Sequence, residues 1–245
     1  MYTCLMYHEV ISPKQSKFSV SPREFEKQIQ CLVSSGVCSY ILDHENANVN
    51  EQHCDSGRHR CMITFDDGHI SNLQAARILA ERGLSAYFYL VKNFSLQRED
   101  YLNEKSIKEI AAMGHHLGVH GKKHEHWTKI EEHILVDDLR ETKDWIEQLT
   151  GNPVITCSAP GGAINLSVIN RIKREIPELK YIRTSHYGVN YDGDTVLNSI
   201  GIKWNYSVEK VLRLAQNDFW EMKKTMLYYH TKELLKPLYH KLKGR

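Results

Sequence analysis

The chain alternates between short apolar runs and longer stretches in which apolar residues recur every three or four positions. The longer stretches are typical of helices that pack on one face. Regular alternation of strands and helices predicts an α/β fold with a largely parallel sheet, either closed as a barrel or open and doubly wound. Seven segments have the length and composition of strands: "TCLMYH", "CMITF", "LSAYFYLV", "HHLGVH", "VITCSAP", "YIRTS" and "TMLYYH".

Local signals place the ends of two of the helices. In "SPREFEKQIQCLVSSG", Ser21 is in the N-cap position, Pro22 is in the first helical position and Glu24 completes a capping box. This helix should end at Gly36. A second amphipathic helix is predicted from about 130 to 149, ending at the glycine that follows it.

Composition narrows the class of protein. With 245 residues and 41% hydrophobic residues, the chain can bury one substantial core, so we expect a single domain over 1–245. The polar stretch at 43–60 is predicted to be a long surface loop. The 32 basic and 30 acidic residues leave a net charge of +2, which does not favour binding to nucleic acid. The six cysteines have no CxxC spacing, so reduced thiols are expected.

Membrane and targeting signals are also weak. The chain has no apolar run of 18 residues, and its start, "MYTCLMYHEV", has neither a basic leader nor a small-residue cleavage pattern. We therefore expect no transmembrane segment and a cytoplasmic location. The basic tail "KELLKPLYHKLKGR" allows contact with a membrane surface as an alternative to a solvated terminal helix.

Chemically reactive groups follow four of the predicted strands at the point where each ends. Because the carboxyl ends of parallel strands meet at one edge of a sheet or barrel, these groups should share a cavity. They are Asp66 and Asp67 after "MITF", His120 and His124 after "HHLGV", Pro160-Gly161-Gly162 after "VITCSA", and His230 at the end of "TMLYY".

Two adjacent carboxylates at the end of a buried strand require a cationic partner. One aspartate oxygen and the imidazoles of His120 and His124 would form a triad that suits zinc or another first-row divalent ion, with positions open for water and substrate. We expect Zn²⁺, with Co²⁺, Ni²⁺ or Mn²⁺ as alternatives. Neighbouring side chains on an extended segment point in different directions, so the second carboxylate would be free to accept a proton.

The order of these motifs resembles that of a known family. "TFDDG", "HGKKH", "APGG" and "LYYH", together with the N-terminal "LMYHEV" and "FSVSPREFEKQI", are similar to the motifs of polysaccharide deacetylases of the NodB-homology, carbohydrate esterase family 4-like type. The resemblance implies a distorted (β/α)7 TIM-like barrel. It also implies removal of N-acetyl groups from a carbohydrate substrate.

The resemblance assigns roles by position. It implies Asp67, His120 and His124 as metal ligands, Asp66 as the general base and His230 as the general acid that protonates the leaving amine. It also implies that the backbone N–H of Gly161 helps to stabilise the oxyanion. The residues expected to line the substrate site are Pro160, Gly161, Gly162 and Tyr229.

The chain departs from the family pattern at several positions. Gly121 and Glu125 stand where the second motif usually has Ser or Thr and Pro. Ser158 occupies the position of the arginine that orients the catalytic base, and Trp204 is a candidate for a tryptophan motif that is otherwise not located. If another basic group reaches Asp66 from a neighbouring strand, for instance Arg183 in "YIRTS", the base stays oriented; if none does, a weakened enzyme or a binding module is favoured.

Alternatives remain open from sequence. One is a degenerate deacetylase that binds glycans without hydrolysing them, which Ser158 favours. Another is a metal-dependent hydrolase of a different bond, such as a cyclic amide or a phosphoester. His8 fits either a pocket-lining or a structural role, and His126 is a rival metal ligand to His124.

Overall fold

The computed structural model describes residues 1–42 and 58–243, so most of the predicted loop at 43–60 lies outside the described residues. One curled sheet forms the centre of the molecule, with strand order β8-β7-β6-β5-β4-β3-β1-β9 and β2 paired to the start of β3. Neighbouring strands run parallel. The strands are β1 Thr3–Tyr7, β2 Cys38–Ser39, β3 Arg60–Phe65, β4 Tyr87–Leu90, β5 His116–Val119, β6 Thr156–Ser158, β7 Tyr181–Arg183, β8 Val196–Leu197 and β9 Ile200–Gly201.

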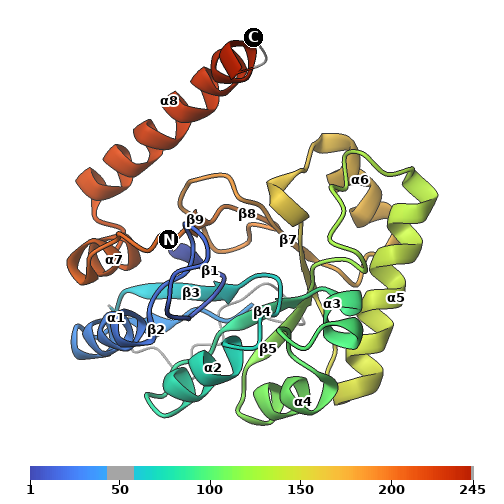
Figure 1. The fold of residues 1–245 in the computed structure, drawn as a ribbon, viewed down its shortest axis with the longest axis horizontal. Helices are drawn as coiled ribbons and strands as arrows, with labels where there is room; N and C mark the ends of the chain where they lie inside the picture. The colour runs from blue at the N-terminus through green and yellow to red at the C-terminus, as the bar shows by residue number, and fades with distance from the viewer. Residues whose placement is uncertain (43–57, 244–245) are drawn as a thin grey trace.

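Helices surround the outer side of this sheet, as Figure 1 shows. The first begins as predicted, with the Ser21 side chain accepting a hydrogen bond from the Glu24 N–H and Pro22 in the first turn. The fifth ends as predicted at Gly151, which has a left-handed backbone. The helices are α1 Pro22–Ser34, α2 Asn72–Ala80, α3 Lys92–Gln97, α4 Glu104–Ala112, α5 Glu132–Thr150, α6 Leu166–Glu175, α7 Val208–Ala215 and α8 Phe219–Lys243.

The predicted α/β class and distorted barrel are confirmed, but the last predicted strand is wrong. "TMLYYH" lies within α8, which extends away from the body of the molecule in Figure 1. A short apolar run does not distinguish a strand from a buried helical turn. In this helix Met222 and Thr225 are buried, whereas Leu227 and Tyr228 are exposed, so the segment packs with a helical period. The sheet is completed instead by the two-residue strands β8 and β9.

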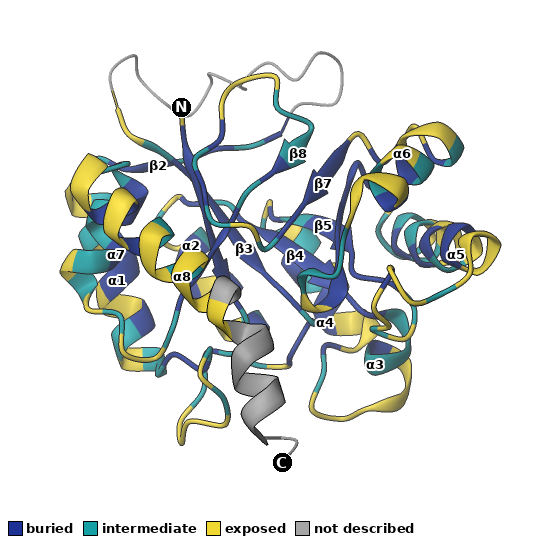
Figure 2. Ribbon diagram, turned by 90° about the horizontal axis from the view of Figure 1, so that it is seen from above, coloured by how far each residue is buried: buried dark blue, intermediate teal, exposed yellow. Residues whose placement is uncertain are grey.

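The strands separate two layers of core. In β4, Tyr87 and Tyr89 join a cluster rich in tyrosine, while Phe88 and Leu90 belong to the larger cluster that packs against helices. This alternation follows from the two-residue period of a strand. Figure 2 shows the strands buried at the centre and exposed residues on the outer sides of the helices. A tightly packed sheet therefore supports the loops that leave its carboxyl edge.

Two expectations drawn from composition can be compared with the structure. Cys4, Cys31, Cys61 and Cys157 are free thiols, but Cys38 is disulfide-bonded, so the expectation of reduced thiols is wrong at that residue. None of the described helices has both the length and the apolar character needed to cross a bilayer.

Candidate active site

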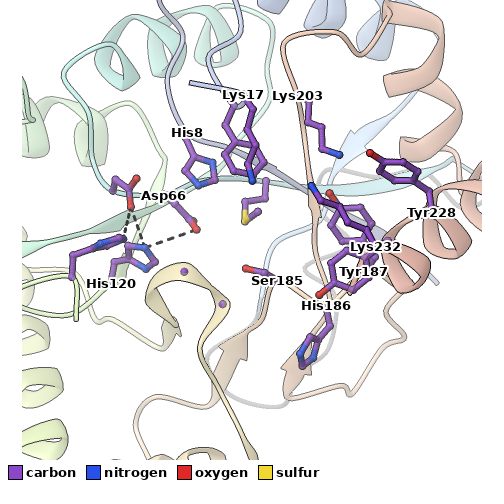
Figure 3. Close-up of a pocket in the computed structure, with 17 residues that line it drawn as sticks. His8, Lys17, Asp66, His120, Ser185, His186, Tyr187, Lys203, Tyr228 and Lys232 are labelled. Carbon is purple, nitrogen blue, oxygen red and sulfur yellow. Dashed lines mark ion pairs between the residues drawn. The ribbon is translucent and has the colours of Figure 1, made fainter. Parts of the chain in front are cut away.

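A cavity of about 420 Å³ opens at the carboxyl edge of the sheet. Residues that follow β3, β5, β6 and β7 line it, which is where parallel α/β folds place their sites. Figure 3 shows Asp66 and His120 at one end of this pocket and Lys203, Lys232 and Tyr228 at the other.

Three of the predicted ligands meet at the first of these ends. Asp67 Oδ1 lies 3.2 Å from His120 Nε2 and 3.0 Å from His124 Nε2. One ligand atom from each residue lies within 4.8 Å of the other two, which is close enough for all three to contact one cation. The structure thus brings Asp67, His120 and His124 together as the sequence predicted.

The hydrogen bonds around this group fit a bound cation. His120 Nδ1 lies 2.8 Å from the carbonyl oxygen of Ser158. Because a carbonyl oxygen only accepts, Nδ1 carries the hydrogen, and Nε2 of the neutral ring presents a lone pair toward Asp67. Asp67 Oδ1 is buried, and no described group donates a well-aligned hydrogen bond to it. Two acceptors that face one another in this way suit a metal ion, and a ring oriented by a backbone carbonyl is usual for metal-binding histidines.

The backbone and charge of this group are also unusual. Asp67 and His124 have φ of 72° and 59°, a left-handed conformation that costs about 1–3 kcal/mol for such residues and concentrates at functional sites. Burial raises the pKa of the Asp67 carboxyl, but His120 and His124, when protonated in the absence of an ion, outweigh burial and hold that pKa well below its usual range. Asp67 is therefore a carboxylate, the form that binds cations.

Asp66 faces a different partner. Its side chain is 4% exposed, and both carboxylate oxygens accept hydrogen bonds from Arg183 Nη2. The same nitrogen contacts Ser158 Oγ. Arg183, the example considered from sequence, does reach Asp66, and Ser158, which occupies the usual arginine position, contacts this guanidinium instead.

Arg183 is itself held on several sides. It is 1% exposed, and its Nη1 donates to Ser199 Oγ at 3.0 Å. The guanidinium carbon lies 5.0 Å from the centre of the Tyr89 ring. A buried arginine with these contacts has little freedom to move, so it fixes the orientation of the Asp66 carboxylate.

The turn that carries the two histidines depends on Gly121. Its φ is +84°, and a Cβ there would lie 3.0 Å from Asp138 Oδ1. That oxygen accepts the Lys122 backbone N–H at 2.8 Å. Glycine at this position, where the family usually has Ser or Thr, thus allows Asp138 to approach and support the turn between His120 and His124.

The "APGG" segment forms a single 3-10 turn at Pro160–Gly162. Gly161 and Gly162 line the pocket, whereas Pro160 is buried and is not among the lining residues. A Cβ on Gly161 would lie 3.0 Å from His126 Nε2. His126 therefore packs against this turn and does not belong to the group formed with Asp67.

The structure does not bring His230 to the site. It lies on α8, is exposed and is not among the residues that line the pocket. The preceding Tyr229 does line the pocket, and its ring stacks on that of Tyr187 at 4.3 Å. The placement of His230 was wrong because it assumed a strand that would point its last residue toward the sheet edge.

Other lining residues were missed or left open. His8 lines the pocket, its ring stacks on Phe18 at 4.5 Å, and its Nδ1 is buried without a hydrogen-bond partner among the described residues. The "MYH" strand end was a sequence signal for it. Lys203 and Lys232 also line the pocket. No motif indicated them, because isolated lysines are common on solvated surfaces.

Comparison with known proteins finds similarity over the part of the chain that carries the ligand group. The polysaccharide deacetylase family model matches residues 54–175. A peptidoglycan-N-acetylglucosamine deacetylase of Bacillus cereus is 30% identical over 113 residues, which are 45% of this chain and 50% of that protein. The chain spans about half the length of the curated relatives it matches.

Two solved structures are similar in fold. The deacetylase PplD of Streptococcus pyogenes, solved with acetate, has a TM-score of 0.77 and 21% identity over 87% of this chain and 97% of that chain. IcaB of Ammonifex degensii has a TM-score of 0.73 and 21% identity over 87% of this chain and 96% of that chain. The matched segment includes the strand ends that carry Asp66, Asp67, His120 and His124, and over this half of its length the chain matches the polysaccharide deacetylase family.

Proposed function

We propose that this protein is a metal-dependent hydrolase that removes the N-acetyl group from an N-acetylated sugar or glycan precursor. The observation that carries the proposal is the pairing of an Asp67–His120–His124 group with a separate, arginine-held Asp66 in one pocket. The family match supports the reaction class. Zinc is the proposed metal because two imidazoles and one carboxylate are ligands it favours.

The two aspartates have different proposed roles, and Asp67 acts with the two histidines. Asp67, His120 and His124 would hold the ion. When bound, a divalent cation would supply Lewis acidity toward the acetyl carbonyl and the attacking water. The backbone N–H of Gly161, which also lines the pocket, is the proposed hydrogen-bond donor to the oxyanion that develops on the acetyl group.

Asp66 is the proposed general base. Both of its oxygens contact Arg183, and its Oδ2 lies 4.0 Å from His120 Nε2, so it sits beside the ligand group without joining it. In this position it would accept a proton from the attacking water. Arg183 and its contacts fix the carboxylate so that little reorganisation is needed during the reaction.

His8 is the proposed proton donor to the leaving amine, in place of His230. Its backbone carbonyl accepts Asn72 Nδ2 at 2.6 Å, and its ring is stacked on Phe18, so the imidazole is held inside the pocket. Burial lowers the pKa of His8, while Asp66 and Asp67 oppose that effect. A titratable ring near both carboxylates suits a role in proton transfer.

The main alternative was a glycan-binding module without catalysis. Its support was the missing arginine at Ser158, and the contact between Arg183 and Asp66 removes that support. An intact base and a complete ligand group favour an enzyme.

Measurement of acetate release tests the proposal. N-acetylglucosamine oligomers would be incubated with the protein as purified, after treatment with a chelator, and after addition of Zn²⁺ or Co²⁺. We expect acetate release to fall to background after chelation and to return with metal. Oligomer binding without acetate release by the metal-loaded protein would contradict the proposal and favour the binding module.

A further inference from the structure

The pocket has a second polar end that the proposed reaction does not use. Three lysines from distant parts of the chain line it: Lys17 from the loop between β1 and α1, Lys203 from the loop between β9 and α7, and Lys232 from α8. In Figure 3, Lys203 and Lys232 lie on the side of the pocket away from His120. The cavity is therefore polarised, with the aspartates at one end and the ammonium groups of Lys203 and Lys232 at the other.

Contacts between the three segments hold the lysine end together. The Trp204 backbone N–H donates to the Lys17 carbonyl at 3.1 Å, which joins the two loops. The Lys203 ammonium lies 5.0 Å from the centre of the Tyr228 ring, which joins the second loop to α8. Lys14 lies 4.1 Å from the Trp204 ring and braces the same junction. The lysines are thus gathered by packing and backbone hydrogen bonds.

The positive charges of Lys203 and Lys232 are not balanced by carboxylates in the part of the chain that the structure describes. Among the described residues, no ion pair joins Lys203 or Lys232 to an aspartate or glutamate, whereas the nearby Lys210 pairs with Glu221 at 2.7 Å. Burial lowers the pKa of Lys203, and the positive charges of Lys232, Lys17 and Lys210 lower it further. Like charges held together in this way repel one another, and an anion between them would relieve the repulsion.

We propose that the pocket takes an N-acetylhexosamine that carries a phosphate ester, with the phosphate at Lys203 and Lys232. The inference rests on the proposed function, because the acetamido group must then reach Asp66 and the ligand group at the other end. Ammonium groups bind phosphate oxygens through charge-assisted hydrogen bonds, while the acetamido group occupies the other end. The two ends together give the substrate one orientation.

Two tyrosines that line the pocket suit the sugar itself. Tyr187 and Tyr229 are stacked at 4.3 Å and both line the pocket. Aromatic faces give a sugar ring a rigid apolar surface. The pocket volume of about 420 Å³ lies in the range of small-molecule sites.

Substitution of the lysines gives the first test. Lys203→Gln and Lys232→Gln would be compared with Lys224→Gln. Lys224 is a matched control because it lies on α8 with Lys232 but does not line the pocket. For acetate release from N-acetylglucosamine 1-phosphate, each pocket variant should raise KM on the order of tenfold, the effect of one hydrogen bond to a charged group. Release from a neutral N-acetylglucosamine disaccharide should change little, and the control should match the wild type with both substrates. Equal losses with both substrates would overturn the inference.

A binding measurement separates this inference from the proposed reaction. Calorimetry would compare N-acetylglucosamine 1-phosphate, UDP-N-acetylglucosamine, N-acetylglucosamine and N-acetylmuramic acid on the wild type and on the Lys203→Gln/Lys232→Gln double variant. If either phosphate ester binds the wild type more tightly than N-acetylglucosamine does, and this advantage is lost in the double variant, the inference is supported even if no acetate is released. Tighter binding of N-acetylglucosamine 1-phosphate indicates a free phosphate ester, and tighter binding of UDP-N-acetylglucosamine indicates a nucleotide-linked one. Equal binding of the phosphate esters and the neutral sugar, or binding of the carboxylate sugar as tight as that of the esters, would overturn it.

Discussion

The two ends of the pocket are built in different ways. Asp66 and His120 directly follow the buried strands β3 and β5, and the two residues are 4% and 1% exposed. Lys203 is half-buried on a loop, and Lys232 is exposed on α8. The first end has fixed geometry, which proton transfer and metal binding require. The second end has longer, more mobile side chains, which suits recognition of a charged group whose position varies between substrates.

Loss of a ligand at the fixed end should have the largest effect. His120→Ala or Asp67→Ala removes one of three proposed ligands, and two remaining donors hold a divalent ion weakly. Acetate release should fall to background and bound metal should be lost, as measured by elemental analysis after dialysis. Lys232→Gln, at the other end, should keep its full metal content. Equal metal content in all three variants would refute the ligand assignment.

Substitution of the two candidate proton donors should separate them clearly. His8→Ala should lower turnover on the order of a thousandfold, because general acid catalysis contributes that much to such reactions. His230→Ala should have nearly normal turnover, since His230 is exposed on α8 outside the pocket. Steady-state kinetics of the two metal-loaded variants decide the matter. A large loss in His230→Ala with none in His8→Ala would restore the assignment implied by the family motif.

Arg183 links stability to catalysis at the fixed end. Arg183→Ala leaves Asp66 buried and unpaired, which should lower the free energy of unfolding by about 3–5 kcal/mol. Turnover should fall on the order of a hundredfold because the base is no longer oriented. Denaturant unfolding and acetate release measure the two effects.

An arginine exchange provides the control for that prediction. Ser158→Arg combined with Arg183→Ser returns the guanidinium to the strand where the family usually carries it. Part of the lost stability and turnover should return in the double variant. If Arg183→Ala alone is as stable and active as the wild type, Arg183 does not hold the base.

The smallest expected effect concerns Asp138, which supports the turn between His120 and His124. Burial raises its pKa to about 6, and Glu125 and Glu141 raise it while the Lys122 N–H opposes them. Since the folded state favours the protonated form, this stabilisation is present below about pH 4 and is lost as the pH rises through about 6.

Asp138→Asn removes that titration. The free energy of unfolding of the wild type minus that of the variant should fall by about 1–2 kcal/mol between pH 4 and pH 8, after allowance for partial exposure. Parallel stability curves for the two proteins would show that Asp138 does not titrate in this range.

The fixed end could be predicted from sequence because its residues sit at the ends of apolar strands. "MITF" and "HHLGV" place Asp67 and His120 at one edge of a parallel sheet, where their positions follow from strand direction alone. Arg183 could be considered from sequence for the same reason, because it ends β7, which pairs with β6 and places Arg183 opposite Ser158. Short-range patterns determine these positions.

The other end could not be predicted because loop paths and a helix determine it. Lys17, Lys203 and Lys232 come together through contacts such as Trp204 N–H to Lys17, which leave no periodic signal in the sequence. His230 was misplaced because an apolar run of five residues fits a strand as well as a helix. The competing signal was the longer helical stretch around it.

The central claim is that Asp66, held by Arg183, is the base beside a separate metal group. The most direct measurement compares acetate release and metal content of the wild type and Asp66→Asn, each purified with Zn²⁺. Asparagine keeps the size of the side chain but does not accept a proton at neutral pH, so turnover should fall on the order of a thousandfold while bound metal stays the same. Near-normal turnover in Asp66→Asn, or loss of its metal along with its activity, would contradict the account.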